Sequence, residues 1–166
     1  SYNGQEVNSN IVTGEIAEVL SGSKTATTGS YSEGSTVTYV ISLVNSGAAA
    51  LNNLTVTDNL GEYQFENQSL YPLSYIDGSL LYYADGVLQA SPQVTVGPPL
   101  VISGVNVPAN GDAVIVYRAN VTQFAPLTSE AEITNSATVS GNALTNPLTL
   151  TETISVEESL RLDITK

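Results

Sequence analysis

The chain of 166 residues contains no histidine, cysteine, methionine or tryptophan, and only four of its residues are lysine or arginine. The lack of histidine and cysteine excludes Ser-His-Asp and Cys-His nucleophile systems, and zinc, haem and iron–sulfur sites built on those ligands. General acid–base catalysis also loses its commonest group, so we expect no turnover enzyme. The sequence predicts no metal ion and no other cofactor. Without cysteine, no disulfide can stabilise the fold.

Positive charge is scarce as well. Sixteen acidic residues against four basic ones give a net charge of −12, which argues against nucleic acid or an anionic membrane surface as a partner. The longest apolar runs, such as residues 113–117, are far shorter than the ~20 residues that span a bilayer, so we expect no membrane insertion of this part of the chain. Ser1 is not a start methionine and no signal-peptide pattern follows it, so we expect a piece of a longer protein.

What the sequence does contain is the alternation typical of β-strands. Hydrophobic residues make up 42% of the chain and charged residues 12%, a balance that favours one folded domain over a disordered acidic tail. Apolar residues recur at every second position between turn signals, and the helical period of 3.6 residues is missing. The alternation predicts strands at residues 37–43, 54–58, 113–121, 133–139 and 151–156.

Turn residues separate these predicted strands. Asp85-Gly86 lies between residues 80–83 and 87–88 and predicts a tight hairpin, because both central residues tolerate a positive φ. Short strands rich in threonine and valine, joined by loops of serine, asparagine, glycine and proline, are typical of two packed sheets. We therefore predict an all-β fold, an immunoglobulin-like antiparallel β-sandwich.

The two ends of the chain resemble each other. Residues 13–19 and 151–157 are short apolar and acidic segments, and each precedes one of the only two lysines, Lys24 and Lys166. Such self-similarity is typical of a tandem array, although a chance likeness of two acidic strands remains an alternative. We predict the end of a preceding repeat or an N-terminal strand or linker at 1–20, a β-sandwich repeat domain at 21–160, and the start of the next repeat at 161–166.

Three polar residues fall on the apolar faces of predicted strands, since alternate residues of a strand share a face. Lys24 shares its face with Leu20 and Ala26. Asp58 follows the apolar positions of residues 54–60, and Asn135 those of residues 133–139. Burying an isolated charge is very costly, so these groups must pair with one another or change their protonation state.

Two interpretations of this pattern remain open. In the first, Lys24 and Asp58 form a buried ion pair with Asn135 as a hydrogen-bonding filler, or all three lie at strand ends and reach water. In the second, the desolvated lysine loses its proton and becomes a nucleophile, and a neutral Asp58 donates a hydrogen bond to the Asn135 carbonyl. Lys24 Nζ then attacks the Asn135 carboxamide, ammonia leaves and an isopeptide bond remains. This happens once per molecule and is self-processing, not turnover.

Several runs of the sequence carry a family resemblance: KTA at 24–26, YSEGSTVTY at 31–39, VNSG at 44–47, NLTVTDNL at 53–60 and ITNSATV at 133–139. They resemble the conserved repeat domain of bacterial surface proteins. The chain is similar, too, to collagen-adhesin A-type domains and Gram-positive pilin domains that carry Lys–Asn isopeptide bonds with an acidic catalyst. The resemblance implies that Lys24 is the nucleophile, Asp58 the catalytic acid and Asn135 the electrophile. Their order along the chain is that of the A-type domains.

The resemblance also implies a function. We expect a structural stalk or adhesin module at the cell surface or cell wall of a Gram-positive bacterium, with neighbouring repeats of the same chain as partners. A bond between Lys24 and Asn135 would close a loop of about 110 residues. Closing the loop would restrict the unfolded chain, and force could not extend the residues inside it.

The alternative function is a ligand-binding adhesin domain. It would grip a glycan or a host matrix protein through the tyrosine-rich segment 61–100, because tyrosine suits recognition surfaces. Packing of these side chains within hairpins is the simpler explanation of the same composition. The tyrosines concerned are Tyr63, Tyr71, Tyr75, Tyr82 and Tyr83.

Overall fold

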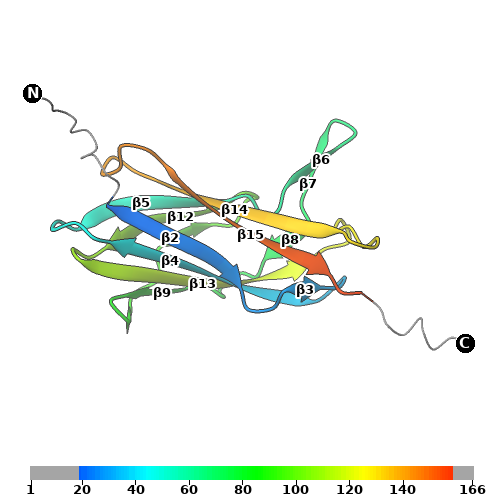
Figure 1. Cartoon of the computed structure of the whole chain (residues 1–166), viewed down its shortest axis with the longest axis horizontal. Coiled ribbons are helices and arrows are strands. Elements are labelled where there is room, and N and C mark those ends of the chain that lie inside the picture. Colours follow the sequence, from blue (N-terminus) through cyan, green and yellow to red (C-terminus); the bar gives the residue numbers. More distant parts are fainter. Residues whose placement is uncertain (1–18, 159–166) are drawn as a thin grey trace, which may run out of the picture.

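A computed structural model describes residues 19–158, and every regular element in that range is a β-strand. The strands form two six-stranded sheets that pack face to face (Figure 1). The predicted all-β, immunoglobulin-like sandwich is therefore confirmed.

The first sheet has the order β10-β9-β13-β4-β2, and β8 also pairs with β13. Its strands are β2 (Leu20–Ala26), β4 (Thr36–Asn45), β8 (Leu73–Tyr75), β9 (Leu81–Ala84), β10 (Val87–Leu88) and β13 (Gly111–Val121). The second sheet has the order β11-β12-β5-β14-β15-β3. Its strands are β3 (Ser30–Tyr31), β5 (Leu51–Asp58), β11 (Gln93–Thr95), β12 (Leu100–Val107), β14 (Glu132–Ser140) and β15 (Leu148–Val156).

A third, two-stranded sheet consists of β6 (Tyr63–Phe65) and β7 (Gln68–Leu70), which project as a hairpin from the body of the sandwich (Figure 1). The five strands expected from alternation all form, as β4, β5, β13, β14 and β15, each slightly longer than predicted. All pairings are antiparallel except that of β15 with β3, which is parallel and only two residues long.

The predicted hairpin at Asp85-Gly86 is also confirmed. It joins β9 to β10, with Ala84 opposite Val87. The turn residues Asp85 and Gly86 have φ values of 49° and 81°, the left-handed conformation that a two-residue hairpin of this type requires.

The core lies between the two sheets and follows from strand alternation. On β4, Val37, Tyr39, Ile41 and Leu43 are all buried, while the residues between them are partly exposed. The same period of two operates on β5, β13 and β14. Because of this alternation, a polar residue at a core-facing position also points into the interior, even though it would be better hydrated at the surface.

The start of β2 and the end of β15 lie at opposite ends of the long axis of the sandwich (Figure 1). The described range ends before residues 161–166, so the predicted next repeat and Lys166 lie outside it, as do residues 1–18 of the predicted first segment. Within residues 19–158 the structure contains no helix that could span a bilayer.

Candidate functional site

A cluster of buried polar side chains lies between the two sheets. Lys24 on β2 is 3% exposed, and Asp58 on β5 and Asn135 on β14 are both 0% exposed. All three thus face the interior, as their positions in the alternation predicted. Because β2 belongs to the first sheet and the other two strands to the second, the cluster spans the interior of the sandwich.

Strand register brings these residues together. β5 pairs with β14 so that Asp58 lies opposite Ala137, two positions from Asn135 on the same face. In the other sheet, β2 pairs with β4 so that Lys24 lies opposite Ile41. The next strand along, β13, places Tyr117 opposite Tyr39 of β4. Two tyrosines of the first sheet therefore face the acid and the amide of the second.

The hydroxyl of Tyr117 contacts all three predicted residues. Lys24 Nζ donates hydrogen bonds to Asp58 Oδ2 at 2.6 Å and to the Tyr117 hydroxyl at 2.8 Å. That hydroxyl donates to Asp58 Oδ2 at 2.6 Å and accepts from Asn135 Nδ2 at 3.1 Å. Since the amine and the carboxamide share one hydroxyl oxygen, they lie within about two hydrogen-bond lengths of each other.

Tyr117 was not identified from the sequence, although a signal for it exists. In β13 it shares a face with Ala113, Ile115 and Ala119, all of them buried. The same parity argument that selected Lys24 therefore marks Tyr117 as an inward-facing residue with a polar end.

Aromatic rings enclose the amine. Lys24 Nζ lies 4.5 Å from the centroid of the Tyr39 ring and 4.9 Å from that of the Tyr117 ring. The two rings stack with their centroids 5.6 Å apart, and Tyr75 packs against Tyr117 at 6.1 Å. Cation–π attraction replaces part of the lost hydration while the amine is charged.

The carboxyl of Asp58 makes no hydrogen bond with the carbonyl of Asn135. Its Oδ1 accepts a hydrogen bond from the backbone N–H of Leu60 at 2.9 Å, and its Oδ2 is occupied by Lys24 and Tyr117. Among residues 19–158, Asn135 Oδ1 has no hydrogen-bond partner. The expected hydrogen bond from Asp58 to the Asn135 carbonyl is not formed in this arrangement, and the role of Asp58 as the catalytic acid stays a prediction.

Burial sets the protonation of the cluster. It lowers the pKa of Lys24 below the ordinary 10.5, an effect that the charge and hydrogen bond of Asp58 and the charge of Glu152 oppose in part. Burial raises the pKa of Tyr117 well above its ordinary value and raises that of Tyr39 as well, so both phenols stay neutral. The Asn135 side chain lies near enough to Tyr39 to oppose its rise in part, yet the two make no hydrogen bond.

The geometry is compatible with both interpretations of the sequence, although the hydrogen bond from Asp58 to the Asn135 carbonyl is not formed. The buried Lys24–Asp58 ion pair is present, with 0% exposure of both side chains. A carboxamide with a free carbonyl oxygen lies beside that pair, which is the juxtaposition that nucleophilic attack needs. The cluster can therefore serve either as a structural polar network or as the unlinked precursor of a covalent bond.

Two of the five tyrosines in the segment 61–100 are buried, and the other three are partly exposed. Tyr75 and Tyr82 belong to the core, and the Tyr82 hydroxyl donates to the carbonyl of Asn106. Tyr63 donates to the carbonyl of Phe124. Only Tyr71 and Tyr75 of the five line a common pocket.

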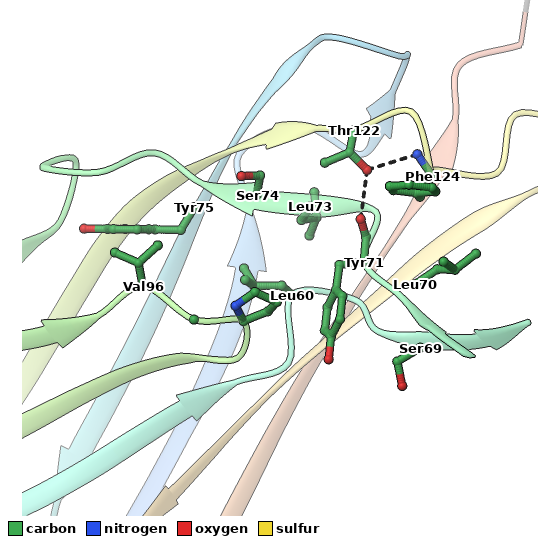
Figure 2. Close-up of a pocket in the computed structure, with 12 residues that line it drawn as sticks. Leu60, Ser69, Leu70, Tyr71, Leu73, Ser74, Tyr75, Val96, Thr122 and Phe124 are labelled. Atoms are coloured by element: carbon green, nitrogen blue, oxygen red, sulfur yellow. Dashed lines mark hydrogen bonds between the residues drawn. The ribbon is translucent and has the colours of Figure 1, made fainter. Parts of the chain in front are cut away.

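That pocket has a volume of about 360 Å³ and lies between the β7–β8 connection and the loop at Val96 (Figure 2). Its lining is largely apolar and, within the described chain, includes no charged side chain. The Thr122 hydroxyl ties two of its walls, donating to the carbonyl of Tyr71 at 2.8 Å and accepting from the N–H of Phe124 at 3.1 Å (Figure 2).

Comparison by sequence identifies no relative: no family model matches the chain, and no curated protein does. Comparison by structure finds pilus and adhesin proteins. The chain is similar to domains D2 and D3 of the major pilin SpaD from Corynebacterium diphtheriae, with a TM-score of 0.60 and 14% identity over 81% of this chain and 51% of that one.

The N-terminal domain of the Streptococcus gordonii adhesin Sgo0707 gives a TM-score of 0.59 and 16% identity over 82% of this chain and 32% of that one. The pilus backbone protein RrgB of Streptococcus pneumoniae gives a TM-score of 0.57 and 14% identity over 73% of this chain and 31% of that one. The chain thus spans about a third to a half of the length of these proteins. At such low identity the likeness establishes a shared fold: this chain has the β-sandwich of Gram-positive pilin and adhesin domains.

Proposed function

We propose that this chain is a structural module of a stalk, pilus or adhesin at a bacterial cell surface, stabilised by a self-formed isopeptide bond between Lys24 and Asn135. The observation that carries the proposal is the burial of an amine, an acid and a carboxamide at one point between the two sheets. The shared fold with pilus backbone and adhesin domains supports the setting. Its partners are neighbouring repeats or subunits of the same assembly.

The reaction needs a neutral amine, and the site favours one. Burial lowers the pKa of Lys24, and Asp58 at 2.6 Å takes the proton that Lys24 gives up. The Nζ lone pair attacks Cγ of Asn135, the Cγ–Nδ2 bond breaks, and ammonia leaves with one proton that began on Nζ. Counted from the neutral amine and the protonated Asp58, the products are one secondary amide and one ammonia, and Asp58, the catalytic acid, ends protonated as it began.

The fold supplies most of the rate enhancement. Well-oriented intramolecular reactions reach effective molarities of 10⁵–10⁸ M, worth roughly 7–11 kcal/mol of the barrier. Here the amine is held by Asp58 and Tyr117 and the carboxamide by Tyr117. Each molecule reacts once, so the activity is autocatalytic processing of the chain and not turnover.

The position of the bond explains its use in a stalk. It links β2 of the first sheet to β14 of the second, and pulling force enters at β2 and leaves through β15 at the other end of the sandwich (Figure 1). The roughly 110 residues between Lys24 and Asn135 form a closed loop that force cannot extend. Only the second half of β14, the following loop and β15 lie outside it, at the C-terminal side.

Accurate intact mass tests the bond directly. We expect the folded chain to be lighter than its sequence mass by one ammonia, and Lys24→Ala and Asn135→Ala to have their full sequence masses. Digestion of the folded chain should yield one branched peptide that joins Lys24 to Asn135. A full sequence mass for the folded, unaltered chain would end the covalent proposal.

Single-molecule pulling tests the mechanical role. With the bond, the sandwich should extend only by residues 136–156, about 70 Å at ~3.4 Å per residue. Without it, as in Asn135→Ala, the whole sandwich should unravel and extend by on the order of 400 Å. Equal extension of the two chains would contradict a bond between Lys24 and Asn135 that carries the pulling force.

A further inference from the structure

We propose that Tyr117 is a catalytic residue of this bond formation, relaying a proton from Asp58 to the leaving nitrogen of Asn135. The inference rests on the proposed function and adds a fourth group to the reaction. Its basis is the set of contacts around one phenol oxygen, which is hydrogen-bonded to the nucleophile, the acid and the leaving group at 2.8, 2.6 and 3.1 Å.

The relay is needed because the acid makes no hydrogen bond with the amide among the residues described. Asp58 Oδ2 contacts Lys24 and Tyr117, and Asp58 Oδ1 contacts the N–H of Leu60. In the part of the chain that the structure describes, the Asn135 side chain makes a single hydrogen bond, from Nδ2 to the Tyr117 hydroxyl. A proton that passes from Asp58 to Asn135 therefore has its shortest route through that hydroxyl.

The direction of the hydrogen bonds fits such a relay. In the ground state the amide nitrogen donates to Tyr117, because its lone pair is delocalised into the carbonyl. When Nζ adds to Cγ, that delocalisation is lost and Nδ2 becomes a basic amine. The Tyr117 hydroxyl then turns its proton from Asp58 Oδ2 toward Nδ2, at the position where the hydrogen bond already exists.

Protons balance over the step. Lys24 begins as a neutral amine beside a protonated Asp58. As Nδ2 takes the Tyr117 proton, Tyr117 takes the Asp58 proton, and Asp58 is reprotonated by the proton that Nζ loses on becoming an amide. Ammonia departs, and both Tyr117 and Asp58 end as they began. Because Tyr117 gains a proton as it gives one, no free phenolate forms, in agreement with a pKa held well above its usual range.

Tyr39 supplies a matched control from the same site. Its ring stacks on Tyr117 and faces Lys24 Nζ at 4.5 Å, so it shares the burial and the aromatic environment. Its hydroxyl, however, makes no hydrogen bond within residues 19–158. Tyr39→Phe and Tyr117→Phe remove the same atom from neighbouring rings, and only Tyr117→Phe interrupts the relay.

The experiment follows bond formation after refolding. Each chain of 166 residues is recovered unfolded from inclusion bodies in urea, diluted into buffer, and sampled for intact mass over time. We expect Tyr117→Phe to lose ammonia at least about 100-fold more slowly than the unaltered chain, the usual range for a lost general acid–base group. Tyr39→Phe should remain within about threefold of the unaltered rate.

A merely structural role for Tyr117 predicts a different result. Circular dichroism and thermal unfolding of Tyr117→Phe, compared with those of unlinked Asn135→Ala, show whether the variant folds. If it does not fold, 3,5-difluorotyrosine at position 117 keeps the ring and the hydroxyl but makes the phenol more acidic. The relay then predicts an altered rate and a lower pH optimum, and a packing role predicts neither.

The outcomes separate the two proposals. An unaltered chain that loses ammonia, together with a folded Tyr117→Phe that does so equally fast, overturns the relay and leaves the isopeptide bond standing. If Tyr117→Phe does not fold, the chain with difluorotyrosine at position 117 decides. An unchanged rate and pH profile of that chain overturns the relay and leaves the isopeptide bond standing. If the unaltered chain never loses ammonia, the proposed function itself fails.

Discussion

Two buried asparagines lie in the interior of this sandwich in very different surroundings. Asn45, at the end of β4, is 1% exposed, and its Nδ2 donates to the carbonyls of Ala49, Val107 and Pro108 at 2.9, 3.3 and 3.0 Å. Its Oδ1 accepts from the N–H of Gly47 at 2.9 Å. Asn135 makes one hydrogen bond, at 3.1 Å, and its Oδ1 has no partner among the residues described.

The difference is the one expected between a structural amide and the reactive amide that we propose. Asn45 ties the end of β4 to the following loop and to the end of β12, so its side chain replaces backbone pairing that the loops lack. The Asn135 side chain connects to the rest of the described structure through one hydrogen bond, and its unpaired buried oxygen lowers the folding stability by about 1–3 kcal/mol. The proposed bond would account for this cost, because it would consume the amide once folding has brought it beside Lys24.

The largest expected effect comes from removing Asn135, the asparagine proposed to react. Asn135→Ala leaves the Lys24–Asp58 pair intact but prevents the covalent link, so it should lose about 4–5 kcal/mol of stability if loop entropy acts as it does for a disulfide. We expect the unfolding temperature to fall by roughly 10–20 °C. Differential scanning calorimetry beside intact mass measures both. An unchanged unfolding temperature would show that the two strands were never joined.

The same substitution at the structural asparagine should behave differently. Asn45→Ala leaves the Val107 carbonyl and its neighbours without a donor, so we expect a loss of about 2–3 kcal/mol from unsatisfied buried groups. The chain should still be lighter by one ammonia, because the site at Asn135 is untouched. Retention of that ammonia in folded Asn45→Ala would remove the distinction between the two amides.

The interior positions of Asp58 and Asn135 were predictable from the sequence, and the reason is local periodicity. The alternation on residues 54–60 and 133–139 places Asp58 and Asn135 in the interior without any knowledge of the partner strands. The Asp85-Gly86 hairpin is equally local. These features depend on one strand or one turn, which a single sequence specifies.

What the sequence did not reveal depends on register between distant strands. Tyr117 and Lys24 are brought together through β4, which pairs with both of their strands, and no pattern within residues 111–121 specifies that partner. The orientation of Asp58 had a local signal that was missed. Asp58 accepts from the N–H two residues on, an Asx turn that ends β5 and occupies Oδ1.

The pH dependence of stability should distinguish the linked from the unlinked chain. In Asn135→Ala, Lys24 has a lower pKa folded than unfolded, so the unfolded chain binds more protons and stability rises with pH toward 10.5. The slope is at most about 1.4 kcal/mol per pH unit for one group. In the linked chain Nζ belongs to an amide and does not titrate, so this slope should be absent.

Urea unfolding of both chains between pH 7 and about 10 measures this difference. Above that range both should lose stability, because burial raises the pKa values of Tyr39 and Tyr117 in the folded state and the unfolded chain ionises first. Parallel curves for the two chains below pH 10 would mean that Lys24 titrates alike in both, which is incompatible with a bond at Nζ.

The smallest expected effect concerns Glu152, which lies opposite Asn135 on β15 and accepts a hydrogen bond from the N–H of Ala26 at 2.9 Å. Its charge opposes the lowering of the Lys24 pKa. Glu152→Gln keeps an acceptor but removes the charge, so a larger share of Lys24 becomes neutral and the bond should form faster. A partly exposed charge contributes about 0.2–1 kcal/mol, so we expect the rate of bond formation to increase by less than about fivefold.

Glu132→Gln, an exposed position on β14, is the matched control and should leave the refolding time course unchanged. A slower reaction in Glu152→Gln would mean that Glu152 acts by holding β2 against β15 and not through its charge, because a charge effect on the amine can only accelerate the attack.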